Sequence, residues 1–155
     1  MRSGKAQELT ELILAIFRAN GALAAWGDGF ASEDGLSTAR WQMLGAVALS
    51  DRPLTAPQIA TRMGVTRQGA QKQLNILVQE GMLEAHPNPL HKRSPHYVLS
   101  EQGRSVYEAI DRRWNAHVLD ASAAFFDADL QAVGTFLNKL TAMYAAKGDG
   151  NDAEA

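Results

Sequence analysis

The feature that most constrains the fold of this sequence is a strong helix start at residue 55, followed shortly afterwards by a glycine. Thr55 and Gln58 have the spacing of a capping box, in which two side chains satisfy free N–H groups at a helix N-terminus. Leu54 and Ile59 stand where the accompanying hydrophobic staple is found. Gly64 suits the left-handed backbone conformation that often ends a helix. The sequence therefore predicts one short helix that ends at residues 63–64.

A second helix is predicted directly after this glycine. Thr66 can cap its N-terminus, and Gly81 stands where a C-terminal cap would lie, so the helix is expected to run to about Glu80. Two short helices joined by a tight glycine turn are typical of a helix-turn-helix.

One face of this second helix carries no acidic residue. At about 100° per residue, Leu74, Leu77 and Val78 share an apolar sector with Ala70. The opposite sector collects five side chains with hydrogen-bonding heads, namely Gln68, Gln71, Lys72, Asn75 and Gln79. A helix that only faces water usually mixes Glu with Lys, whereas amides and a cation suit base edges and phosphates. An ordinary solvated face is the alternative, but the second helix of a helix-turn-helix can enter the major groove of DNA.

A hairpin with a positive tip is predicted next. Residues 82–86 and 96–99 can form two strands, and the loop 87–95 between them contains three prolines. His91, Lys92 and Arg93 lie in this loop and must project away from the strand pairing. We expect Arg93 in the minor groove, where negative potential attracts arginine, and Lys92 on the phosphate backbone.

Charge supports a nucleic-acid partner for this middle segment. Residues 52–104 hold seven Lys and Arg against three Asp and Glu, a net charge of +4, and the remainder holds eight against fourteen, or −6. Thr66 and Arg67 lie at a helix N-terminus, where exposed N–H groups favour a phosphate. The predicted DNA contacts are Thr66, Arg67, Gln68, Gln71, Lys72, Asn75, Lys92 and Arg93.

Amphipathic helices are predicted on both sides of this segment. The first has the apolar row Leu9, Leu12, Ile13, Ile16 and Phe17, and a glycine-rich loop is expected at 27–35. Ser37 can cap a second helix that stops at 51–53. Beyond the hairpin, Ser100 and Asp127 can cap two further helices. The last carries the a/d-like row Leu130, Val133, Leu137, Leu140 and Tyr144, which predicts a helix seam.

Composition excludes several classes of protein. The chain has 155 residues, 46% of them apolar, and no cysteine, which rules out disulfides, thiolate metal sites and a cysteine nucleophile. No glycine-rich phosphate loop, GxSxG or HExxH motif is present, so we expect no enzyme and no cofactor. We also expect no membrane-spanning segment and a cytoplasmic location, and a disordered tail at 147–155.

At this point the sequence resembles the MarR family of winged-helix transcriptional regulators. The resemblance spans roughly residues 36–104 and rests on LSTARWQML (36–44), IATRMGVTRQ (59–68), LVQEGMLE (77–84) and VLSEQGR (98–104), in that order and spacing. It implies a mainly α fold with a small β-hairpin wing, flanked by N- and C-terminal dimerisation helices. The corresponding parts are 1–35 and 105–146 for dimerisation and 36–104 for DNA binding.

The resemblance also implies a function. A homodimer would place one recognition helix in each major groove of a roughly palindromic double-stranded operator, usually to repress transcription. One departure concerns the wing, which lacks the family's usual aspartate between the proline and the arginine. Arg93 could then be oriented by His91, by Asn88 or by neither.

The resemblance further implies a cleft for a small-molecule effector. The side chains that could line it are Trp26, Phe30, Trp41, Met43, Trp114 and His117. Core packing is the commoner role for a Trp or Met at helical spacing.

Two other readings of the middle segment remain open. His86, His91 and His96 are spaced five apart and could belong to a metal-responsive regulator, although no carboxylate is placed with them to complete a site. A winged helix can also serve as a protein–protein interaction module, because fold does not dictate function.

Overall fold

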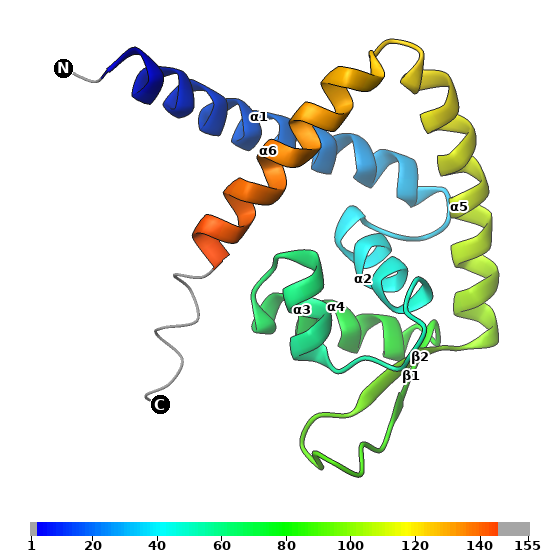
Figure 1. Ribbon diagram of the computed structural model, residues 1–155. Coiled ribbons are helices and arrows are strands. Elements are labelled where there is room, and N and C mark those ends of the chain that lie inside the picture. Colours follow the sequence, from blue (N-terminus) through cyan, green and yellow to red (C-terminus); the bar gives the residue numbers. More distant parts are fainter. Residues whose placement is uncertain (1–2, 146–155) are drawn as a thin grey trace. The chain divides into compact units, whose positions relative to one another are not determined.

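The computed structural model describes residues 3–145, which form six helices and one two-stranded sheet (Figure 1). The elements are α1 (Gly4–Ser32), α2 (Thr38–Ala48), α3 (Ala56–Met63), α4 (Arg67–Gln79), β1 (Leu83–His86), β2 (His96–Leu99), α5 (Glu101–Ser122) and α6 (Asp127–Ala145). They fall into two compact units, Met1–Arg112 and Arg113–Ala155. The tail predicted at 147–155 lies outside the described residues.

The core of the first unit is built where the apolar faces of α2, α3 and α4 meet. Its fully buried large side chains are Met43, Leu44, Ile59, Leu74, Leu77, Leu83 and Ile110. Ala70, Leu74 and Leu77 are each 0% exposed, so α4 buries the sector that the helical wheel predicts. The opposite sector of α4 is therefore free to face outward.

The helix-turn-helix is confirmed in its local details. The backbone N–H of Thr55 donates to Oε1 of Gln58 at 2.9 Å, which is one arm of the predicted capping box. Gly64 ends α3 in the left-handed conformation with φ of 65°. The Thr66 hydroxyl then accepts the N–H of Gly69 at 3.0 Å and caps α4. Each contact spans three residues, so these turns form from local sequence alone.

The loop predicted at 27–35 is wrong, because α1 continues as a helix to Ser32. Gly27 serves close packing instead of a turn: a Cβ atom at this position would lie 2.5 Å from Oγ1 of Thr38, the first residue of α2. The Thr38 hydroxyl donates to the carbonyl of Ala24 at 2.8 Å, which ties the two helices together at this crossing. A glycine inside a helix costs about 1 kcal/mol of helix propensity, and here the close approach of α2 offsets that cost.

Asp28 has a role at the same helix crossing. Its Oδ1 accepts the backbone N–H of Thr38 at 2.8 Å, next to Ser37, whose hydroxyl caps α2 as predicted by accepting the N–H of Arg40 at 3.2 Å. The hydrogen bond from the Thr38 backbone N–H is the main cause that lowers the pKa of Asp28. A carboxylate is favoured here because a helix N-terminus attracts negative charge.

By length and composition, α1 is long and apolar enough to cross a membrane. This contradicts our expectation that no segment reaches that threshold. One such helix is weak evidence for a membrane span, because helices of soluble proteins pass the same test. In this structure the C-terminal part of α1 packs against α2 through Ala24, Gly27 and Asp28, and buries Ala31 completely.

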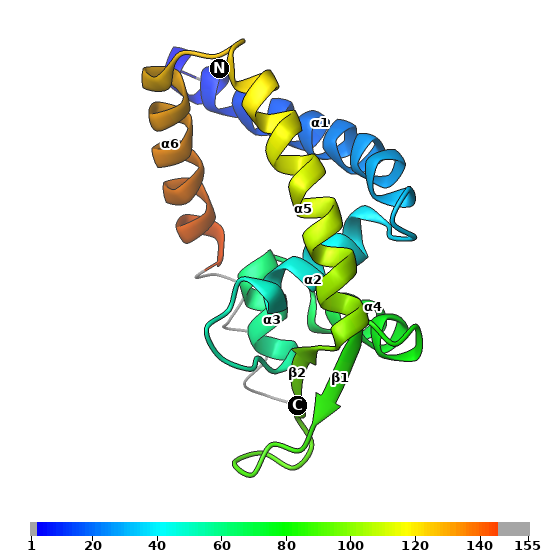
Figure 2. The same cartoon turned by 90° about the vertical axis from the view of Figure 1, so that its right-hand side faces the viewer.

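The hairpin is an antiparallel pair that projects from the helices as a wing (Figure 2). Its register pairs Leu83 with Leu99 and His86 with His96. A bridge between Leu54 and Tyr97 joins β2 to the segment before α3, through the Tyr97 N–H and the Leu54 carbonyl at 2.8 Å. The base of the wing is thus attached directly to the helix-turn-helix.

The second unit contains the end of α5 and the helix α6. Asp127 was predicted to cap α6, but it is the first residue of the helix, and the carbonyl of Phe126 accepts the N–H of Asp129 and of Leu130. Four of the five residues of the predicted apolar row on α6 are exposed, Leu130 by 49%, Val133 by 54%, Leu137 by 37% and Tyr144 by 56%, and Leu140 is half-buried. Among the described residues of α6 none is buried.

Candidate nucleic-acid interface

The outward face of α4 presents polar and cationic side chains without a carboxylate. Gln68, Lys72, Asn75 and Gln79 are exposed, as the helical wheel predicts, while Gln71 is half-buried. Arg67, at the N-terminus of the helix, is also exposed. Thr66 is exposed as well, but its hydroxyl is occupied in capping the helix. Any contact of Thr66 with phosphate therefore adds to a structural role.

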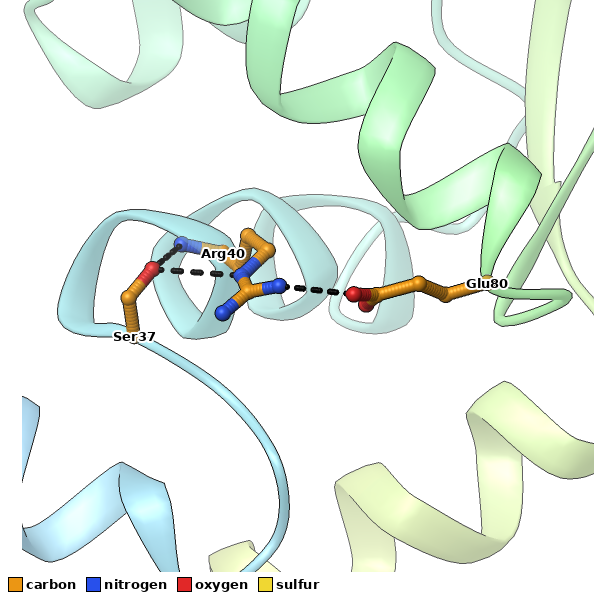
Figure 3. Close-up of polar contacts among 3 residues, drawn as sticks. All are labelled: Ser37, Arg40 and Glu80. Carbon is orange, nitrogen blue, oxygen red and sulfur yellow. Dashed lines mark hydrogen bonds and ion pairs between the residues drawn. The ribbon is translucent and has the colours of Figure 1, made fainter.

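The first carboxylate after α4 is paired with an arginine. Glu80 follows the last residue of α4, where the helix dipole disfavours an acid, and its Oε1 accepts from Nη1 of Arg40 at 2.8 Å (Figure 3). Nε of Arg40 also donates to the Ser37 hydroxyl at 3.3 Å, so the guanidinium is held at both ends. This pair offsets the negative charge of Glu80 at the C-terminal end of α4.

The side chain of Gln71 connects α4 to the wing. Its Nε2 donates to Oδ1 of Asn75 at 2.8 Å and to the hydroxyl of Tyr97 at 2.9 Å. Tyr97 is only 3% exposed and belongs to β2. Sequence reasoning missed Tyr97, because an aromatic residue in a short strand carries no sign of a partner 26 positions away.

The tip of the wing is organised by Asn88, which is only 7% exposed. Its Nδ2 donates to the carbonyl of Ser94 at 3.0 Å, and its Oδ1 accepts the N–H of Leu90 at 3.1 Å. The loop is therefore closed by the amide of Asn88, which precedes Pro89. The sequence left open whether His91, Asn88 or neither orients Arg93. In the structure Asn88 shapes the loop that carries Arg93, through hydrogen bonds to the backbone.

Lys92 and Arg93 are exposed at this closed tip, beside a leucine that is 94% exposed at position 90. Neither cation forms a hydrogen bond or an ion pair with another residue of the described range 3–145. Both charges are consequently available to a phosphate backbone or a groove.

The histidines give little support to a metal site. His86 and His96 are direct partners in the sheet. Contrary to the expectation that no carboxylate accompanies them, Oε2 of Glu84 lies 2.8 Å from Nε2 of His86. Across residues 3–145 no group of three or more His, Cys, Asp or Glu side chains is arranged to hold a metal ion.

The predicted effector residues fall into two groups. In the first unit Trp26 stacks on Phe30 with ring centroids 4.9 Å apart, and Phe30 lies 5.4 Å from Trp41. In the second unit Trp114 and His117 are 5.8 Å apart. Met43 is 2% exposed and belongs to the core, which is the commoner role of a Met at helical spacing.

A hollow that sequence reasoning did not anticipate lies beside the helix-turn-helix. It is lined by Ser50, Asp51, Arg52, Leu54, Gln58 and Arg62. None of the predicted effector residues lines it.

Comparison with known proteins agrees with this architecture. The family model described as "MarR family" matches residues 34–94. An uncharacterized protein of Mycobacterium tuberculosis, Rv2011c, is 46% identical over 106 residues, which cover 68% of this chain and 73% of that protein.

Two solved structures share the fold. A MarR family transcription regulator, SP03579, matches with a TM-score of 0.75 at 23% identity and covers 97% of both chains. A mutant of MarR from E. coli in complex with operator DNA matches with a TM-score of 0.73 at 18% identity, over 89% of this chain and 99% of that one.

The helix-turn-helix and the two-stranded wing define a winged-helix fold. The chain belongs to the MarR family. Members of this family are DNA-binding transcription factors without enzymatic activity, as the absence of catalytic motifs predicts.

Proposed function

We propose that this regulator is a homodimeric repressor that binds a palindromic operator. The observation that carries the proposal is the exposed face of α4, which offers Arg67, Gln68, Lys72 and Asn75 with no acid among them. An α-helix fits the major groove, which is about 12 Å wide, and amides and cations match the base edges and phosphates found there. Residues 36–104 are the DNA-binding part in this proposal.

The wing adds a second contact on each half-site. The tip closed by Asn88 carries Lys92 and Arg93, both exposed. We assign Arg93 to the adjacent minor groove and Lys92 to the phosphate backbone, since narrow minor grooves attract arginine through their negative potential. A preformed loop binds with a smaller entropy loss than a mobile one.

Dimerisation is supported by apolar surface on the helices outside residues 36–104. On α1 the exposed large apolar side chains are Leu9, Leu12, Leu14, Phe17 and Leu23. On α6 they are Leu130, Val133, Leu137, Met143 and Tyr144. Rows of this kind on a soluble regulator need a partner surface. A symmetric pair would present two α4 helices about 34 Å apart, which matches one turn of DNA.

Release by a small molecule is part of the same proposal. Trp26, Trp41, Trp114 and His117 remain our candidate effector contacts, each considered within its own unit, with an aromatic or lipophilic ligand as the class. Because the proposed target is operator DNA, we expect the protein to act in the cytoplasm.

Selection of genomic DNA at two salt concentrations tests this proposal. Full-length protein is mixed with fragmented DNA of the source genome, and the fragments that stay bound at the higher salt are sequenced. Phosphate contacts weaken steeply with salt, so base readout is what survives. We expect a few fragments that share an inverted repeat. Binding that disappears with salt and enriches no sequence would contradict the proposal and favour a protein-binding winged helix.

A further inference from the structure

The amide of Gln71 uses both of its N–H groups inside the protein. A glutamine amide has two donors on Nε2 and acceptor capacity only on Oε1. Here one N–H points to Oδ1 of Asn75 at 2.8 Å and the other to the hydroxyl of Tyr97 at 2.9 Å. Oε1 of Gln71 is therefore left as an acceptor that no hydrogen bond within the described range engages, and we infer that it faces outward.

Asn75 offers hydrogen-bond donors where Gln71 offers an acceptor. Its Oδ1 is engaged by Gln71, one helical turn earlier on α4, so its exposed Nδ2 carries two donors that bond to no residue of the described range. The outward face of α4 thus presents an acceptor at Gln71 and a donor at Asn75.

Tyr97 is the anchor of this arrangement because its own position is rigid. It is 3% exposed and lies in β2, where its Cα is paired with Ala85. Its N–H also donates to the carbonyl of Leu54 at 2.8 Å, which holds it to the segment before α3. The hydroxyl of Tyr97 consequently occupies a fixed point beside α4.

We propose that Tyr97 is a positioning residue for base readout, and that the amide pair it orients makes α4 select an amino base opposite Gln71. In the major groove only adenine N6 and cytosine N4 can donate to an outward acceptor. Guanine and thymine present acceptors at the corresponding edge and are rejected. The neighbouring Asn75 donates to a purine N7, to guanine O6 or to thymine O4.

This inference rests on the proposed DNA-binding function and makes it more specific. The reverse orientation of both amides would expose a donor at Gln71 and an acceptor at Asn75, and would select guanine or thymine opposite Gln71. The identity of the selected base therefore distinguishes the two arrangements.

The test is selection of binding sites from random double-stranded DNA by the full-length protein and three variants. Gln71→Ala identifies the position that Gln71 reads, because the preference there is lost. Tyr97→Phe keeps the buried ring and removes only the hydroxyl. Tyr107→Phe is the matched control, since it removes a tyrosine hydroxyl whose hydrogen-bond partner is Oδ1 of Asp111 on α5, at 3.5 Å, and not a residue of α4.

We expect adenine or cytosine at the position read by Gln71 in the wild-type sites. In Tyr97→Phe, discrimination at this position and at that of Asn75 should fall by about 3- to 10-fold, as expected for one lost hydrogen bond. Preferences at other positions and affinity for nonspecific DNA should stay unchanged, and Tyr107→Phe should select as the wild type does.

Two results would overturn the inference: guanine or thymine at the Gln71 position, or undiminished discrimination in Tyr97→Phe. The fold of each variant is checked by its thermal unfolding midpoint. If Tyr97→Phe is unstable, Asn75→Asp is tested in its place.

The carboxylate that Asn75→Asp introduces still accepts from Gln71, but its second oxygen replaces the outward donor of Asn75 by an acceptor. The selected sites should then carry adenine or cytosine at the position read by residue 75 as well. If the wild type itself enriches no sequence, the proposed function fails instead.

Discussion

Nη1 of Arg40 lies 2.8 Å from Oε1 of Glu80 and joins the first turn of α2 to the residue that ends α4. The two side chains are 22% and 38% exposed, so water and salt screen part of their attraction. The pair nevertheless compensates an acid at a helix C-terminus, where the dipole is unfavourable.

Removal of this ion pair should lower stability only slightly. Arg40→Gln is expected to reduce the free energy of unfolding by about 0.5–1 kcal/mol, as for other partly exposed pairs. Urea denaturation of Arg40→Gln, Glu80→Gln and the double variant gives the interaction energy as a double-mutant cycle. A coupling that does not shrink in about 1 M salt would show that the contact is not mainly electrostatic.

Alanine substitutions at two glycines of α1 should change the stability of the protein in opposite directions. Gly27→Ala places a Cβ 2.5 Å from Oγ1 of Thr38, and we expect a loss of about 1–3 kcal/mol from overpacking. Gly29→Ala meets no atom within 4 Å and should stabilise the helix by about 0.5–1 kcal/mol. Thermal or urea unfolding measures both, and equal effects of the two changes would refute the close approach of α2 at Gly27.

Asp28 should contribute to the pH dependence of stability. Its pKa is lowered in the folded state chiefly by the hydrogen bond from the Thr38 backbone N–H, so the unfolded chain binds a proton at higher pH than the folded one does. The contribution is complete above the ordinary aspartate pKa of about 3.9. It is lost as the pH falls through the folded-state value.

Asp28→Asn tests this sign, because it keeps an acceptor for the Thr38 N–H and removes the titration. The difference in unfolding free energy between wild type and variant should be largest near pH 6 and should decrease below about pH 4. Chemical denaturation over this pH range measures it. A difference that grows as the pH falls would mean that the pKa is raised instead.

Charge removal from α4 and the wing should weaken DNA binding without affecting the fold. For Lys72→Ala combined with Arg93→Ala, we expect the slope of log affinity against log salt to fall by about one to two units. The matched control is Lys5→Ala with Arg112→Ala, which removes the same charge from exposed positions on α1 and α5. Fluorescence anisotropy at several salt concentrations measures the slope, and equal losses in both pairs would indicate a nonspecific charge effect.

Acidic residues in the apolar row of α6 should separate the subunits. Leu137→Asp with Leu140→Asp is expected to yield monomers, with operator affinity reduced by roughly 100-fold because bivalent binding is lost. Gln131→Asp with Asn138→Asp adds the same charge on exposed positions outside this row and should leave the dimer intact. Sedimentation analysis reports the oligomeric state. If the leucine variant is still a dimer, the dimer interface does not include this row of α6.

Much of the first unit could be predicted because its signals are local. The caps at Thr55, Thr66 and Ser37 and the left-handed Gly64 depend on neighbours within a few positions, and all four are confirmed. The loop at 27–35 failed for the opposite reason. Its glycine content indicates a turn, but Gly27 is required by a helix that approaches from residue 38.

The sequence by itself determined the helix-turn-helix, the wing and the acid-free face of α4, because periodicity and capping act over one or two turns of chain. The tertiary structure alone decided which groups those elements bring together. Arg40 meets Glu80 across 40 positions, and Gln71 meets Tyr97 across 26. Such pairs leave no periodic trace in a sequence, since their geometry exists only after the core has positioned α4 against α2 and the wing.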